Sequence, residues 1–121
     1  MRYMMIWKPA DPSKVEGGIS PSQEMMIGMG KFIEELAKSG ALLMTDGLQS
    51  SSKGARVRLS GGKFTVIDGP FTETKELIGG FAILRLNSKA EAIELTKRFL
   101  SIAGEGESEI RLMPDEPAYA R

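Results

Sequence analysis

The spacing of apolar residues predicts a strand, a loop and a helix in the first third of the chain. Apolar side chains stand on both sides of a strand expected over Arg2 to Trp7, which is typical of a strand covered on both faces. Lys8 to Ile19 is rich in Pro, Gly and charge and has no core-forming pattern, so we expect a loop there. The helix then runs from Pro21 to Ser39, with Ser20 as N-cap and Gly40 at the C′ position. Its apolar stripe consists of Met25, Met26, Met29, Phe32, Ile33 and Leu36.

The rest of the chain alternates between strand and helix patterns. The expected elements are a strand over Ala41 to Thr45, a hairpin of Arg56 to Ser60 and Lys63 to Ile67 around Gly61-Gly62, a strand over Phe81 to Leu86, a helix opened by Ser88 and ended by Gly104, and a strand over Glu109 to Met113. Pro114 to Arg121 is a tail without periodicity.

This order predicts an α+β domain. Two long helices with a mostly antiparallel sheet place both helices on one face, with the hairpin as an insertion, and leave the other face in need of cover. The apolar first strand, together with Phe64 and Val66, suggests that a second copy of the chain provides this cover. We therefore expect a homodimer formed through sheet faces.

Composition narrows the classes of function. The 121 residues are enough for one domain with one core. The 16 basic and 16 acidic residues cancel, which argues against a nucleic-acid partner. No apolar run is long enough to span a membrane, and the amino terminus lacks a signal-peptide cleavage pattern, so we expect a cytoplasmic protein. With no Cys and no His, the chain has no thiol nucleophile and lacks the commonest general base, and we expect neither a metal nor a cofactor.

The densest group of unusual residues is the segment from Asp68 to Glu76, which reads DGPFTETKE. It connects two predicted strands through a sharp Gly-Pro turn, with Gly69 free to adopt positive φ. Asp68 is the candidate general base, because a carboxylate in an apolar pocket or beside another carboxylate has a raised pKa. Phe71, Glu73, Lys75 and Glu76 are candidate ligand-binding residues. The alternative is structural: Asp68 caps an Asx turn and the other charged side chains face water.

Two further groups could hold a ligand. Ser50 to Gly54, with Arg56 and Arg58, has the hydroxyls and cations that bind a phosphate or carboxylate, although its spacing is not that of a P-loop and a solvated loop is the alternative. Asp46 ends the second predicted strand, where it lies near Trp7 if the first two strands are neighbours. Asp46-Gly47 is also an ordinary turn sequence.

The DGPFTETKE segment closely resembles the signature of the DGPFAETKE family, a branch of the YCII-related proteins, with Thr72 in place of Ala. The order and spacing of the other elements extend this resemblance over nearly the whole chain. It implies a ferredoxin-like fold, usually paired into a dimeric α/β barrel. A His-Asp pair is the proposed acid/base couple of YCII-related enzymes. Because this chain has no His, the resemblance does not carry over that couple or a dehydrochlorinase-like activity.

Three hypotheses for the function follow. The first is a dimeric protein that binds a small polar or anionic molecule in a pocket between sheet and helices, rimmed by the DGPFTETKE segment. The second is a lyase or isomerase that uses Asp68 as base and Lys75 or Arg56 to stabilise an oxyanion. The third is a regulatory module, because the resemblance implies an association with extracytoplasmic-function sigma factors.

Overall fold

The computed structural model describes residues 1–17, 20–71 and 77–115. Its elements are β1 (Arg2–Pro9), α1 (Ser13–Glu16), α2 (Gln23–Lys38), β2 (Leu42–Gly47), the 3-10 turn η1 (Ser51–Lys53), β3 (Ala55–Ser60), β4 (Lys63–Asp68), β5 (Gly80–Arg85), α3 (Lys89–Ala103) and β6 (Gly106–Leu112).

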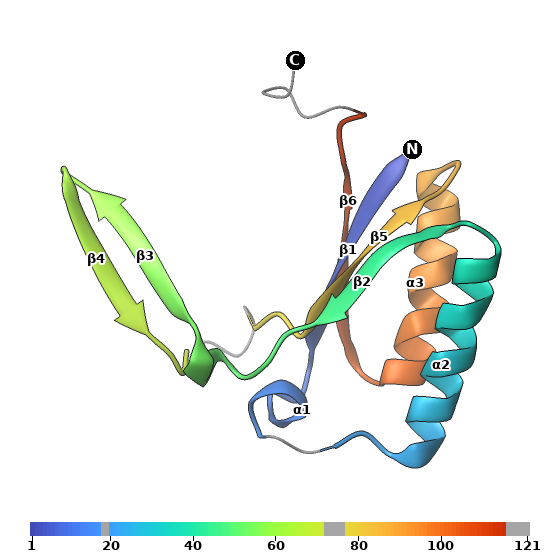
Figure 1. The fold of residues 1–121 in the computed structure, drawn as a ribbon, viewed down its shortest axis with the longest axis horizontal. Coiled ribbons are helices and arrows are strands. Elements are labelled where there is room, and N and C mark those ends of the chain that lie inside the picture. Colours follow the sequence, from blue (N-terminus) through green and yellow to red (C-terminus); the bar gives the residue numbers. More distant parts are fainter. Residues whose placement is uncertain (18–19, 72–76, 116–121) are drawn as a thin grey trace.

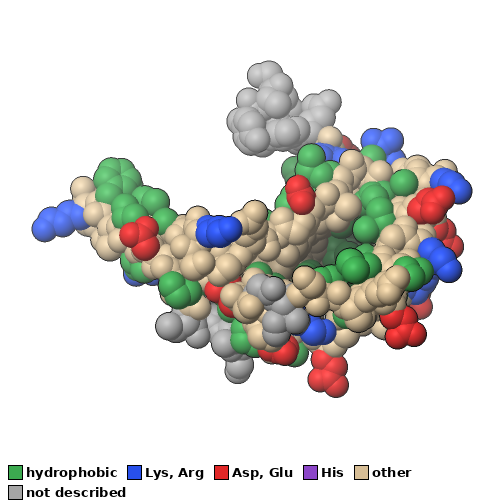
Figure 2. All heavy atoms as spheres, turned by 60° about the horizontal axis from the view of Figure 1, so that its bottom comes forward, with side chains coloured by type: hydrophobic (Ala, Val, Ile, Leu, Met, Phe, Trp, Pro, Cys, Tyr) green, Lys and Arg blue, Asp and Glu red, His purple; other side chains and the backbone are tan. Residues whose placement is uncertain are grey.

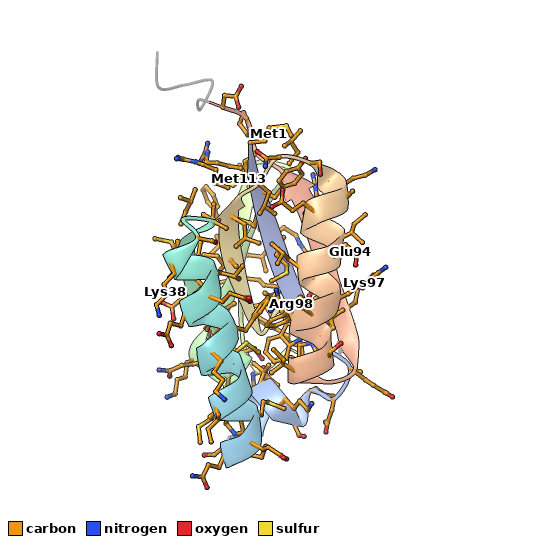
Figure 3. The ribbon with its side chains drawn as sticks, turned by 90° about the vertical axis from the view of Figure 1, so that its right-hand side faces the viewer. Met1, Lys38, Glu94, Lys97, Arg98 and Met113 are labelled. Carbon is orange, nitrogen blue, oxygen red and sulfur yellow. The ribbon has the colours of Figure 1, made fainter. Side chains whose placement is uncertain are left out.

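Four of the strands form one antiparallel sheet in the order β2-β5-β1-β6 (Figure 1). The two long helices, α2 and α3, lie side by side on one face of this sheet (Figure 3). This is a ferredoxin-like arrangement, and it confirms the predicted α+β class with helices on one face. The condition under which Asp46 would lie near Trp7 is not met: β1 and β2 are not neighbours, because β5 lies between them.

The strand β1 supplies side chains to both faces of the sheet. Tyr3 and Met5 are buried at 5% and 7% exposure and point toward the helices, where they join the core. Alternation along the strand places Met4 and Ile6 on the opposite face, which no described helix covers. We call the side of the sheet away from α2 and α3 the open face.

Two polar contacts help to align the helices. Arg98 of α3 lies between the helices (Figure 3), where it forms an ion pair with Glu35 of α2. Its guanidinium carbon also lies 4.9 Å from the centre of the Phe32 ring. The ion pair is exposed, so we expect it to contribute little to stability compared with burial of Phe32 itself.

The ends of the helices show where local sequence rules hold. Ser88 caps α3 as predicted, with its hydroxyl oxygen accepting the Glu91 N–H. For α2 the predicted cap was wrong, because Ser22, and not Ser20, accepts the Met25 N–H. Both serines match the N-cap preference, so residue type alone did not distinguish them. The predicted loop over Lys8 to Ile19 also contains the short helix α1.

The strands β3 and β4 form a separate hairpin that projects away from the sheet and helices (Figure 1). Gly61 and Gly62 both have positive φ, 57° and 79°, as a two-residue turn of this kind requires, which confirms the predicted hairpin. Direct cross-strand pairing puts four apolar side chains on one face, each 61–73% exposed: Val57, Leu59, Phe64 and Val66. We call this set the hairpin apolar face.

A matched pair of glycine substitutions tests the backbone of α2. A Cβ added at Gly30 or at Gly40 meets no heavy atom within 4 Å. Gly30 is inside the helix, so Gly30→Ala should raise the free energy of unfolding by about 1 kcal/mol. Gly40 has φ 79°, so Gly40→Ala should lower it by about 1 kcal/mol or more. Thermal unfolding should show shifts of several degrees in opposite directions; two shifts of the same sign would contradict this account.

Candidate functional site

The described part of the chain forms a cavity of about 780 Å³ between the sheet and the two long helices, open to solvent on one side. In Figure 2 the surface is hollowed on one side, with hydrophobic side chains around the hollow. The sheet contributes Met5 and Trp7, while the helices contribute the apolar side chains that follow: Met25, Met29, Phe32, Leu95 and Phe99. A volume of this size lies within the usual range for small-molecule sites.

Few polar residues line the cavity, and several of their polar atoms are already engaged. The Thr45 hydroxyl donates to the Phe81 carbonyl oxygen (3.0 Å), and Asp46 Oδ1 accepts the Gly47 N–H (2.9 Å). Lys14 also lines the cavity, and its Nζ donates to the Ala103 carbonyl oxygen at 3.0 Å. The lining is therefore mainly apolar, with a single lysine among the polar groups.

Trp7 is held at one end of the cavity by close packing. Its ring meets the Phe99 ring edge-to-face, with centroids 5.8 Å apart. On the other side it lies so close to Gly79 that a Cβ there would stand 2.6 Å from a ring carbon, so this position requires glycine. The Trp7 Nε1–H is buried without a hydrogen-bond partner among the described residues.

The Gly-Pro turn of the DGPFTETKE segment is built against the loop that contains η1. The Gly69–Pro70 peptide is cis. Gly69 is not in the positive-φ region, contrary to expectation. A Cβ on Gly69 would lie 1.7 Å from the Ser51 carbonyl oxygen, so glycine is needed here because two backbones approach closely. Phe71 N–H then donates to Ser51 Oγ at 2.9 Å.

Glu16 of α1 completes this contact. Its carboxylate accepts hydrogen bonds from the Ser51 N–H (2.9 Å), the Ser51 hydroxyl (2.7 Å) and the Ser50 hydroxyl (3.3 Å). The bond from the Ser51 backbone, followed by that from its hydroxyl, lowers the pKa of Glu16 below its ordinary value of 4.5. The Ser-rich loop thus holds an anion, as its residue types predict, but here the anion is a carboxylate of the same chain.

The described candidate residues do not all meet in one place. Asp46 borders the cavity, although its pairing with Phe81 directs its side chain away from the helices, and Arg56 lies over the Phe71 ring, 4.0 Å from its centroid. Asp68 is exposed at the end of β4 and is not among the lining residues. The Asx turn expected at Asp68 does not use the next amides, since those of Gly69 and Phe71 donate to Gly54 and Ser51 and proline has none. Glu73, Lys75 and Glu76 lie outside the described residues.

Sequence reasoning missed three residues that the structure makes prominent: Lys14, Glu16 and Trp7. The first two fall in the segment expected to be a loop without pattern, where nothing in the local sequence indicates a partner. Trp7 was predicted only as part of a strand. The signal that could have singled it out is that it is the only tryptophan in the sequence.

The described residues offer no evident site for a metal. No group of three or more acidic side chains is clustered within residues 1–17, 20–71 and 77–115. In the same ranges, no helix is both long and apolar enough to cross a membrane.

The chain belongs to the YCII-related domain family, whose model matches residues 1–112. Among solved structures, it is similar to a 5-chloro-2-hydroxyhydroquinone dehydrochlorinase (TftG) from Burkholderia phenoliruptrix AC1100, in complex with 2,5-dihydroxybenzoquinone. The two chains are 11% identical, each is covered over 94% of its length, and the TM-score is 0.44. The comparison with curated proteins gives no match.

The contact between Glu16 and the Ser-rich loop predicts an acid-dependent loss of stability. Because the pKa of Glu16 is lowered in the folded state, its contribution is present above about pH 4.5 and is lost as the pH falls through the folded-state pKa. Glu16→Gln should therefore melt below wild type at neutral pH, and the difference should shrink as the pH falls below 4.5. Glu105→Gln, in the turn before β6, is the control and should melt like wild type at neutral pH. A difference for Glu16→Gln that does not change with pH would show that charge is not the cause.

Proposed function

We propose that this chain is a small-molecule-binding protein whose ligand occupies the cavity between the sheet and helices α2 and α3. The observation that carries the proposal is an apolar space of about 780 Å³ inside a domain of this size. Apolar side chains that line an open space of this kind are in contact with water, and a bound apolar molecule removes that contact. The methionines from α2 suit this role, because flexible thioether side chains adapt to differently shaped ligands.

This proposal changes the expected ligand. The sequence predicted a polar or anionic molecule in a pocket rimmed by Asp68, Phe71, Glu73 and Lys75. The described lining is mainly apolar, and Asp46 is the only described candidate residue in it. The same geometry favours binding over the lyase or isomerase hypothesis, because Asp68 is exposed and does not line the cavity. The regulatory hypothesis stays a prediction. We also place the chain in the DGPF branch on the strength of its DGPFTETKE segment, and in the cytoplasm.

A neutral fluorescent probe tests the site. N-phenyl-1-naphthylamine should bind wild type, and its fluorescence should increase on binding, because a mainly apolar cavity can bind an uncharged aromatic molecule. Gly30 lines the cavity in a row with Met26 and Ile33, and space is open beside it. Gly30→Leu should weaken binding several-fold by occupying part of the space, while the matched variant Gly30→Ala should bind like wild type. Equal binding by all three proteins, or none by wild type, would contradict the proposal.

We further propose that two copies pair through the open face of the sheet. Cross-strand pairs place Met4 beside Ile83 and Ile6 beside Phe81 on this face, so apolar side chains form its centre. Charged residues surround them, and Lys8 and Glu109 form an ion pair at 3.2 Å. An apolar centre with a polar rim is typical of an interface between protein chains. The hairpin apolar face adds a second exposed apolar surface that a partner copy would cover.

A charge placed on the open face should prevent this pairing. Ile83→Glu should sediment as a monomer at concentrations where wild type is a dimer. Ile93→Glu places the same charge on α3, where the side chain is 37% exposed, and should stay dimeric. A monomeric wild type, or a dimeric Ile83→Glu that retains its fold, would rule out this interface.

A further inference from the structure

Two polar groups meet at one end of the cavity. Trp7 packs on Phe99 of α3, and Lys14 donates to the carbonyl oxygen of Ala103, one helical turn further along. Both residues line the cavity, so the indole and the ammonium group lie at the same end, near the last turn of α3. The first turns of α2, which are rich in methionine, lie beside this end of α3, because the two helices run in opposite directions (Figure 1) and a Cβ on Gly28 would stand 3.5 Å from Ile102 Cγ2.

The polar atoms at this end have unused hydrogen-bonding capacity. Trp7 Nε1 is a donor only, and it is buried without a partner among the described residues. Ser108 pairs directly with Trp7 across β1 and β6, and its hydroxyl oxygen is also buried and unpartnered in the described part of the chain. Lys14 has three N–H donors, of which the Ala103 carbonyl takes one.

The carboxylates nearby do not occupy these donors. Asp11, whose pKa is lowered mainly by its hydrogen bond from Ser13 and in part by Lys14, accepts from the Ser13 hydroxyl and N–H. Thr45 pairs with Ala82, whose side chain is in the core under the helices. Asp46 is the next residue of the strand and pairs with Phe81, so its side chain points to the open face. Among the described residues, neither carboxylate therefore takes a donor of Lys14, whose side chain is exposed, whereas the Trp7 Nε1 is buried.

We propose that the ligand is an apolar molecule with one anionic, hydrogen-bond-accepting group, such as a carboxylate, and that this group binds at the Trp7 and Lys14 end of the cavity. This inference rests on the proposed function, because it concerns the same cavity. The apolar body lies against the rings of Phe99 and Phe32 and the methionines of α2. The acid group accepts from Lys14 Nζ, a charge-assisted bond that a neutral ligand cannot form.

Three probes with the same apolar body separate the two proposals: 4-phenylbutyrate, 4-phenylbutylamine and butylbenzene. Binding to the complete chain is measured by calorimetry and by the fluorescence of Trp7, the only tryptophan. We expect 4-phenylbutyrate to bind at least about tenfold more tightly than the amine, as charged hydrogen bonds contribute more than neutral ones. Lys14→Met keeps roughly the length of the side chain and removes its charge. It should weaken the binding of 4-phenylbutyrate about tenfold and leave the affinity for butylbenzene unchanged. Lys97→Met, an exposed change on α3 away from the lining, should leave all three affinities as in wild type.

The outcomes distinguish the proposals. If butylbenzene binds and 4-phenylbutyrate binds no better than the amine, the acid-binding end is wrong and the apolar cavity stands. If Lys14→Met binds 4-phenylbutyrate like wild type, the lysine does not hold the acid group and the inference fails. If none of the three probes binds wild type, the cavity is not a ligand site and both proposals fail. Unchanged butylbenzene binding by Lys14→Met shows that this variant is folded.

Discussion

The pairing of β1 with β5 on one side and β6 on the other is the constraint on which the rest of the molecule depends. It places a strand with apolar side chains on both faces at the centre of the sheet. Tyr3 and Met5 become the core under the helices, Trp7 becomes one end of the cavity, and Met4 and Ile6 become the centre of the open face. One short sequence therefore contributes to the core, the cavity and the centre of the open face.

The helices rest on this sheet without filling the space above it. Phe32 and Leu36 in the second half of α2 are buried, whereas Met25 and Met29 in its first half line the cavity, and Met26 is 53% exposed. Side chains this flexible tolerate an unfilled space at less cost than branched ones, because they change shape with their contents. A domain that packed its helices only for stability would close this space, and its presence is the reason to infer a ligand.

A second contact system joins parts of the chain that the sheet leaves separate. Glu16 in α1, Ser51 in η1 and Phe71 after β4 are linked by hydrogen bonds through a single serine. These bonds fix the base of the hairpin, and the Gly69–Pro70 turn fits against the Ser51 carbonyl because Gly69 has no side chain. The DGPFTETKE segment therefore has a structural role at its first residues. Among the described residues, the hairpin is held at its base and projects from the domain with its apolar face exposed (Figure 1).

The sequence by itself determined the elements and their class. Periodicity located both long helices and the hairpin, Ser88 and Gly61-Gly62 marked a cap and a turn correctly, and the order of elements predicted two helices on one face of an antiparallel sheet. These features depend on residues close in the chain, so local patterns are enough to predict them. Only the tertiary structure decided the neighbours of β1, the partner of Glu16 and the residues around the cavity. Lys14, Trp7 and Phe99 meet because strands and helices far apart in sequence pack together, and no local pattern records which side chains such packing brings into contact or how much space it leaves between them.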